Sequence, residues 1–135
     1  MLPKAMHLTG THIENGCASN QAKCPLALML NDHLEDGWLA FSEVGRTYLV
    51  PNEDHIAYLD KDSESIEDSD EYVDEIGGII LRHEDRIIDW IMYYDKHNDM
   101  FTCHVFPDDT ENPTFLSMNR TGRDEWLKDR AERSN

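Results

Sequence analysis

The sequence predicts an α+β fold, in which a small, mainly antiparallel sheet packs against two main helices in a single domain. Two observations indicate the helices: an apolar run that begins at Pro25, and apolar residues at helical spacing between Glu84 and Asp95. Two more indicate the sheet: strand-like segments on either side of a Val-Gly-Arg turn, and an alternating segment from Phe101 to Phe106. With 135 residues, 39% of them hydrophobic, the chain is long enough to bury one core.

The N-terminal third of the chain predicts a strand, a helical turn and a buried helix, in that order. Residues 4–9 fit a short strand, and a helical turn capped by a threonine is expected over residues 12–15. Pro25 stands in the first-turn position that proline favours, and strong helix formers follow it. We therefore expect a helix from Pro25 to about Leu34, ended by the Asp-Gly pair at Gly37.

The middle of the chain predicts a hairpin and a second buried helix. Residues 38–42 and 47–50 fit two strands joined by a turn, and Asn52 can cap a short helix over residues 53–59. Between residues 84 and 95, apolar side chains recur at i, i+1, i+4 and i+5, which is typical of an amphipathic helix packed on a core.

The C-terminal third predicts one strand and a terminal helix. Residues 101–106 alternate with period two, as a strand does. Pro107 and Pro113 then bracket an acidic loop, and residues 124–133 fit a short helix.

Net charge is the strongest compositional feature. The chain has 28 Asp and Glu against 12 Lys and Arg, a formal charge of −16. Five of the basic residues lie between Arg120 and Arg133, so we divide the chain into an acidic α+β domain, residues 1–119, and a C-terminal tail or short helix, residues 120–135. A field of this sign repels nucleic acids and anionic membranes and attracts basic protein surfaces and cations. We therefore expect no direct binding to DNA, RNA or membranes.

Acidic residues are densest between residues 60 and 75, which we expect to form a surface loop or a mobile connection. This segment holds nine acids and a single base, Lys61. Tyr72 and the nearby Tyr58 would serve as exposed aromatic anchors for a partner. The candidate partner-binding residues are Asp60, Asp62, Glu64, Glu67, Asp68, Asp70, Glu71, Tyr72, Asp74 and Glu75.

Two metal sites are alternatives to a plain solvated surface. Carboxylates stand at positions 1, 3, 5, 9 and 12 of a calcium-loop frame, at Asp60, Asp62, Glu64, Asp68 and Glu71. Position 6 is Ser65, however, where the sharp turn of such a loop needs glycine. Zinc would draw on His7, His12, Cys17 and Cys24, of which only the two histidines approach the spacing of structural zinc sites. We expect no metal and no cofactor, and keep a calcium- or zinc-binding interaction module as an alternative.

A small enzyme is the third alternative. Cys24, at the start of a helix, would have its thiolate stabilised by the helix dipole, and His12 or His33 would serve as the base. The sequence contains no glycine-rich phosphate loop and no hydrolase motif, and nothing in the spacing brings these residues together. We therefore expect no enzymatic activity.

Cysteine usage and hydropathy indicate a cytoplasmic protein. The three cysteines are an odd number and fit free thiols in a reducing compartment. No apolar run approaches the roughly 20 residues of a membrane helix, and no secretory signal is visible.

Three motifs together resemble a group of small uncharacterised proteins encoded by bacteriophages and prophages. They are His12-Ile13-x-x-Gly16, then Cys24-Pro25-Leu26-Ala27-Leu28, then Ile87-Ile88-x-x-Ile91-x-x-x-Asp95 ahead of the Phe101–Phe106 strand. In that group the cysteine before the proline often has a close upstream partner, whereas Cys17 lies seven positions from Cys24. The resemblance implies a phage origin and an α+β fold, and it implies neither an activity nor a Cys-Cys metal site.

The leading hypothesis is a phage-type accessory protein that inhibits a host nucleic-acid-binding or defence protein, such as a CRISPR or restriction protein. Its acidic surface would mimic nucleic acid and occupy the basic surface of that host protein in the cytoplasm. The sequence leaves the identity of the target and the oligomeric state open.

Overall fold

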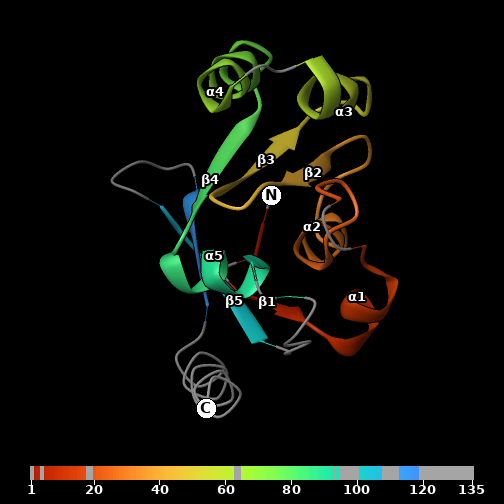
Figure 1. Ribbon diagram of the computed structural model, residues 1–135, viewed down its shortest axis with the longest axis vertical. Coiled ribbons are helices and arrows are strands. Elements are labelled where there is room, and N and C mark those ends of the chain that lie inside the picture. Colours follow the sequence, from red (N-terminus) through yellow and green to blue (C-terminus); the bar gives the residue numbers. More distant parts are fainter. Residues whose placement is uncertain are drawn as a thin grey trace.

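The computed structural model describes residues 2–3, 5–17, 20–62, 65–92, 94, 101–107 and 113–118. Within those residues, one six-stranded sheet has the order β1-β5-β6-β4-β3-β2 (Figure 1). Its strands are β1 (Ala5–Leu8), β2 (Leu39–Ser42), β3 (Arg46–Val50), β4 (Ile79–His83), β5 (Phe101–Pro107) and β6 (Pro113–Met118). Neighbouring strands are antiparallel except β4 and β6, which are parallel. The predicted α+β class is confirmed, with a mixed sheet that is mainly antiparallel.

Both predicted main helices are present, and the structure adds a longer one between them. The helices in the described part of the chain are α1 (Gly10–Asn15), α2 (Pro25–Asn31), α3 (Asp54–Ala57), a π-helical turn η1 (Tyr58–Asp62), α4 (Ile66–Glu75) and α5 (Asp85–Met92). None of them combines the length and apolar character needed to cross a membrane. The expected terminal helix over residues 124–133 and the tail from residue 120 lie outside the described residues.

One face of the sheet is covered by α2 and α5. Leu26 and Leu30 of α2 and Ile87 and Trp90 of α5 are fully buried. They form one cluster with side chains from all six strands. Because strand side chains alternate between faces, Leu49 points into this cluster while its neighbours in β3 point the other way. This is the core that the apolar periodicity of the sequence predicts.

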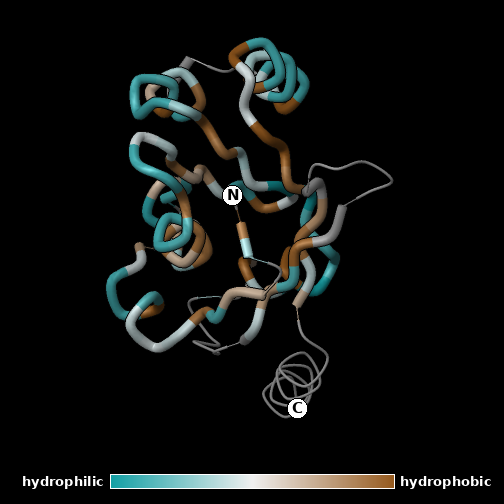
Figure 2. The backbone as a smooth tube through the Cα atoms, turned by 180° about the vertical axis from the view of Figure 1, so that it is seen from behind, coloured by the Kyte–Doolittle hydropathy of each residue, from teal (hydrophilic) through white to brown (hydrophobic). Residues whose placement is uncertain are grey.

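The opposite face, at the β2-β3-β4 side of the sheet, carries α3, η1 and α4. Its smaller core combines Phe41, Tyr48 and Val50 from the strands with Leu59 of η1 and Val73 of α4. Figure 1 shows α3 and α4 side by side at one end of the molecule, above β2 and β3. Along α4, the tube of Figure 2 is hydrophilic for most of its length, with short hydrophobic stretches.

The loop expected over the acidic segment is wrong for residues 66–75, which form α4. A glycine pair makes the tight return from this helix to β4 possible. Gly77 ends the helix with φ +76°, a left-handed conformation that favours glycine. Gly78 then passes so close to Val73 that an added Cβ would lie 2.6 Å from its side chain.

The C-terminal part of the sheet also differs from expectation. Pro113, which the sequence placed at the end of a loop, begins strand β6. Pro113 is paired with Pro107 at a point where the β5-β6 register shifts, which is compatible with two residues that lack amide hydrogens. The sequence missed this strand because proline is depleted in strands, and the segment after Pro113 is too short to show a clear period.

Candidate functional site

Helix α4 places the acidic residues of the sequence in two different environments. Its N-cap, Ser65, has an extended backbone, and its hydroxyl accepts a hydrogen bond from the Asp68 amide at 3.1 Å. Glu67 and Asp68 lie in the first turn, where negative charge interacts favourably with the helix dipole. Ser69 and Val73 are buried against the sheet. The helix therefore has an inner face that docks on the sheet and an outer face in solvent.

Asp70 belongs to the inner side and is held by two residues of β3. Its carboxylate accepts hydrogen bonds from the Arg46 guanidinium and from the Tyr48 hydroxyl, the latter at 2.7 Å. Burial raises the pKa of Tyr48, and the hydrogen bond to Asp70 raises it further, so Tyr48 remains a donor. Burial likewise raises the pKa of Glu43, while the nearby Arg46 opposes that increase. Asp70, a candidate partner-binding residue, is thus engaged within the protein.

Tyr72 is also directed inward. Its ring stacks on Tyr58 with centroids 4.0 Å apart, and its hydroxyl lies 2.5 Å from Nδ1 of His55. Both tyrosines are half-buried, so the expectation of two exposed aromatic anchors is wrong. The two rings instead fasten α4 to α3 and η1.

Four carboxylates of α4 remain exposed, and we call them the acidic helical face: Glu67, Glu71, Asp74 and Glu75. They stand at i, i+4, i+7 and i+8, a spacing that brings residues to one side of a helix. None of the three ion pairs found among the described residues includes any of them. Asp60, Glu53 and Asp54 are exposed on the neighbouring α3–η1 segment. Among the described residues, the acidic helical face and Asp60 are the acidic part of the predicted site that is exposed to solvent.

The other predicted residues are placed less fully. Asp68 is half-buried in the first turn of α4, and the backbone of Asp62 ends η1. Glu64 and the side chain of Asp62 lie outside the part of the chain that the structure describes. The calcium-loop frame does not form a loop, since its positions from Ile66 onward are helical. In the described residues, no three His, Cys, Asp or Glu side chains gather in a way that would hold a metal ion.

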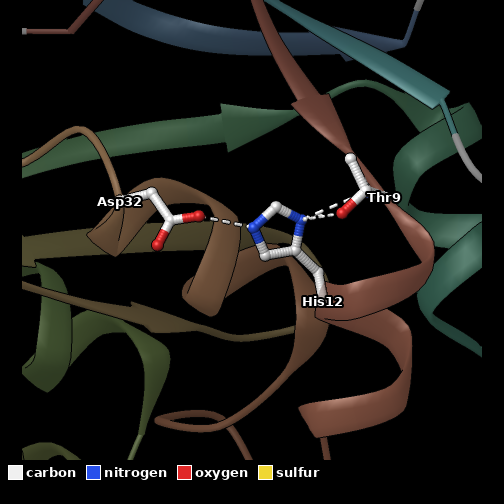
Figure 3. A network of polar contacts seen from close by, with 3 residues as sticks. All are labelled: Thr9, His12 and Asp32. Carbon is white, nitrogen blue, oxygen red and sulfur yellow. Dashed lines mark hydrogen bonds and ion pairs between the residues drawn. The ribbon is translucent and has the colours of Figure 1, made fainter.

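His12, a candidate base in the alternative enzyme hypothesis, has structural partners on both ring nitrogens. Figure 3 shows His12 between Thr9 and Asp32. The Thr9 amide donates to Nδ1 at 3.0 Å, so the hydrogen lies on Nε2, which contacts Oδ2 of Asp32 at 2.6 Å. His12 thereby completes a capping box at the start of α1 and ties that helix to the end of α2. Both ring nitrogens are engaged, and neither is directed to Cys24.

Cys24 is a buried N-cap of α2 with a poorly reactive thiol. Hydrogen bonds from the backbone of Leu26 and Ala27 favour its thiolate, but burial outweighs them and raises the pKa of Cys24. Desolvation therefore counteracts the thiolate stabilisation that the sequence predicts at this helix start. His7, a further candidate zinc ligand, contacts the Thr102 hydroxyl at 3.0 Å, and Cys17 is exposed.

Sequence reasoning missed a buried polar chain at the β2-β3-β4 junction. Nδ1 of His83 donates to the Val44 carbonyl at 3.0 Å, so Nε2 accepts from the Thr47 hydroxyl at 2.6 Å, and Ser42 lies 2.9 Å from Thr47. Burial lowers the pKa of His83 to about 4. These residues come from three strands, and no local motif joins them. The side chains of these residues form a neutral hydrogen-bonded network that satisfies polar groups in the core.

Comparison of the chain with protein-family models, with curated proteins and with solved structures finds no match.

Proposed function

We propose that this chain is a phage-type binding protein that inhibits a host nucleic-acid-binding or defence protein by presenting the acidic helical face to its basic surface. The observation that carries the proposal is the arrangement of Glu67, Glu71, Asp74 and Glu75 on one solvent-exposed side of α4. Such a surface acts by charge complementarity and needs no catalytic group.

The charge density of this face supports nucleic-acid mimicry. From Glu67 to Glu75, eight rises of about 1.5 Å span about 12 Å, so the four carboxylates have a mean spacing of about 4 Å along the helix axis. Duplex DNA carries one phosphate per roughly 3.4 Å along each strand. A basic groove that binds one strand of DNA would therefore meet a similar linear density of negative charge on α4.

The local energetics of α4 also favour a role outside the fold. Glu67 and Glu71, and Glu71 and Glu75, are like-charge pairs at i, i+4, which destabilise isolated helices by about 0.2–0.5 kcal/mol per pair. Asp74 and Glu75 lie in the last turn, where the helix dipole disfavours carboxylates and no basic residue is present. Glu71, Asp74 and Glu75 thus oppose helix formation, whereas Asp70 supports it, and binding a basic partner would relieve the repulsion.

The test is binding to a basic target, with and without the acidic helical face. The immobilised chain would be loaded with a host lysate at low salt and eluted with a salt gradient, in parallel with the variant Glu67→Gln/Glu71→Gln/Asp74→Asn/Glu75→Gln. A matched control, Glu14→Gln/Glu35→Gln/Asp36→Asn/Asp85→Asn, removes the same number of exposed charges from other elements.

We expect the unmodified chain and the control to retain a nucleic-acid-binding protein that DNA competes off and moderate salt releases. The α4 variant should lose it, and purified target should lose its nucleic-acid binding or activity when the unmodified chain is added. Equal retention by the α4 variant and the control would refute the proposal, because the charge would then act only through its total.

A further inference from the structure

A groove beside α3 combines apolar and acidic lining in a way that the acidic helical face does not. It has a volume of about 440 Å³, and its lining includes the apolar residues Leu39, Ala40, Ile56 and Ala57 and the acidic residues Glu53 and Asp54. A second hollow of about 430 Å³ shares Leu39 and Glu53 with it. Leu39 and Ala40 belong to β2, the last strand of the sheet, so the groove lies at the edge of the sheet. Figure 1 shows β2 between α3 and α2.

The edge of the sheet at this groove is closed to an added strand. β2 is an edge strand, but its Ala40 amide donates to Oδ1 of Asn31 at 2.8 Å, and its Ser42 amide donates to the Gln21 carbonyl at 2.9 Å. A partner that docked by β-augmentation would need these amides. Recognition in the groove therefore depends on side chains.

The lining fits a long basic side chain. Leu39 and Ile56 are half-buried and offer apolar surface, whereas Glu53 and Asp54 are exposed and take part in none of the ion pairs found in the described part of the chain. Arginine and lysine place an aliphatic stem on apolar surface and keep a cationic head at its margin. The guanidinium of arginine also matches carboxylates with paired hydrogen bonds, which an ammonium cannot do.

We propose that this groove is the anchor site for an arginine side chain on the basic surface of the partner. The stem would lie on Leu39 and Ile56, and the guanidinium would bind the carboxylates of Glu53 and Asp54. The inference rests on the proposed function, since the partner is the basic protein that the acidic helical face attracts. The acidic helical face provides long-range attraction, and the groove provides a contact that depends on shape.

The test uses a small probe, acetyl-Gly-Arg-Gly-amide, followed by the methyl NMR signals of isotopically labelled Ile and Leu. We expect saturable shifts at Leu39 and Ile56, with Leu26 and Ile87 on the opposite face of the sheet unchanged. The same peptide with citrulline in place of arginine keeps the shape without the charge, and it should bind at least about tenfold more weakly.

Two variants separate the groove from general acidity. Ala57→Trp fills the groove without changing the charge, and Thr11→Trp places the same side chain on an exposed position of α1. The first should abolish the shifts at Leu39 and Ile56, and the second should leave them intact. Glu53→Gln/Asp54→Asn should weaken the arginine peptide to the affinity of the citrulline peptide, which provides a second readout should Ala57→Trp fail to fold.

Failure of this inference can be told apart from failure of the proposed function. If citrulline binds as well as arginine, or if Ala57→Trp binds like Thr11→Trp, the arginine site is overturned, whatever the behaviour of the acidic helical face. If the arginine peptide binds at Leu39 and Ile56 while neutralising α4 leaves target binding unchanged, the proposed function falls and the arginine site stands.

Discussion

The helices on the two faces of the sheet are held in different ways. On the α2–α5 face, the contacts are apolar, with Leu26, Leu30, Ile87 and Trp90 fully buried. On the other face, α4 buries one apolar residue, Val73, and relies on a capping serine, a tyrosine stack and the carboxylate of Asp70. A helix can therefore dock with few apolar residues when specific polar and aromatic contacts position it, and its outer residues are then not constrained by the fold.

The largest expected effect would test whether the two faces contribute unequally to stability. Trp90→Ala on the apolar face should lower the free energy of unfolding by about 3–5 kcal/mol, because it leaves a large cavity. Val73→Ala on the α4 face should lower it by about 2 kcal/mol, since only two methyl groups are lost. Urea unfolding followed by circular dichroism measures both. An equal loss for the two variants would mean that α4 contributes as much of the core as α5 does.

The second effect concerns the neutral hydrogen-bonded network of His83, Thr47 and Ser42. Thr47 and His83 stand two residues from Leu49 and Leu81, so they lie on the α2–α5 face of the sheet. The pKa of His83 is lowered to about 4 in the folded state, from a usual value of about 6.5. Between these values the unfolded chain binds a proton that the folded chain does not, so stability should fall as pH decreases from about 6.5 to 4. Over this range, His83 should lower the free energy of unfolding by about 3 kcal/mol, and it should cause no pH dependence above pH 6.5.

The variant His83→Gln isolates that contribution. Its free energy of unfolding should change less between pH 7 and pH 4.5 than that of the unmodified chain, even if its stability at pH 7 is lower. Because the other titrating groups are common to both proteins, the difference between the two pH profiles reports His83. Parallel profiles would show that the pKa of His83 in the folded state is close to its value in the unfolded chain.

The third effect contrasts the inner and outer acids of α4. Asp70→Ala leaves the Arg46 guanidinium and the Tyr48 hydroxyl without their shared acceptor, and it should lower the free energy of unfolding by about 1.5–3 kcal/mol. Asp74→Ala, four residues further along the same helix, should change it by less than about 0.5 kcal/mol. Thermal and urea unfolding of the two variants measure the contrast. Similar losses would place Asp74 in a structural contact as well.

The two faces also differ in how well the sequence predicts them. The apolar periodicity of residues 84–95 and the run after Pro25 predicted α5 and α2, because burial in an apolar core leaves a repeating pattern in the sequence. The sequence did not predict the helix over residues 66–75, because its high charge indicated a loop. Its contacts with Arg46, Tyr48 and His55 join positions 17 to 24 residues apart, so no local pattern records them. Ser65 followed by Asp68 was the one local signal, that of a helix cap.

The sequence predicted the candidate site only as a continuous segment, residues 60–75. The structure shows which carboxylates of that segment lie on the exposed face of α4. Counting acids located residues 60–75 but could not separate Asp70, which binds Arg46, from Glu71, which is exposed. That division follows from the helical period once the helix is known. The groove at Glu53 and Asp54 could not be predicted, because its floor comes from β2 and α3, whose proximity is set by the packing of the sheet.

The smallest expected effect on stability is also the one that most directly separates fold from function. The variant Glu67→Gln/Glu71→Gln/Asp74→Asn/Glu75→Gln removes like-charge repulsion along α4 and carboxylates at its C-terminal end. It also removes the favourable charge of Glu67 in the first turn, so the net change should be an increase of no more than about 1 kcal/mol in the free energy of unfolding. Low-salt thermal unfolding should show the increase, and high salt should reduce it, because salt screens exposed charges. A loss of stability in this variant would show that the outer acids stabilise the fold. A loss of target binding could then result from disruption of α4, and it would not identify the acidic helical face as a binding surface.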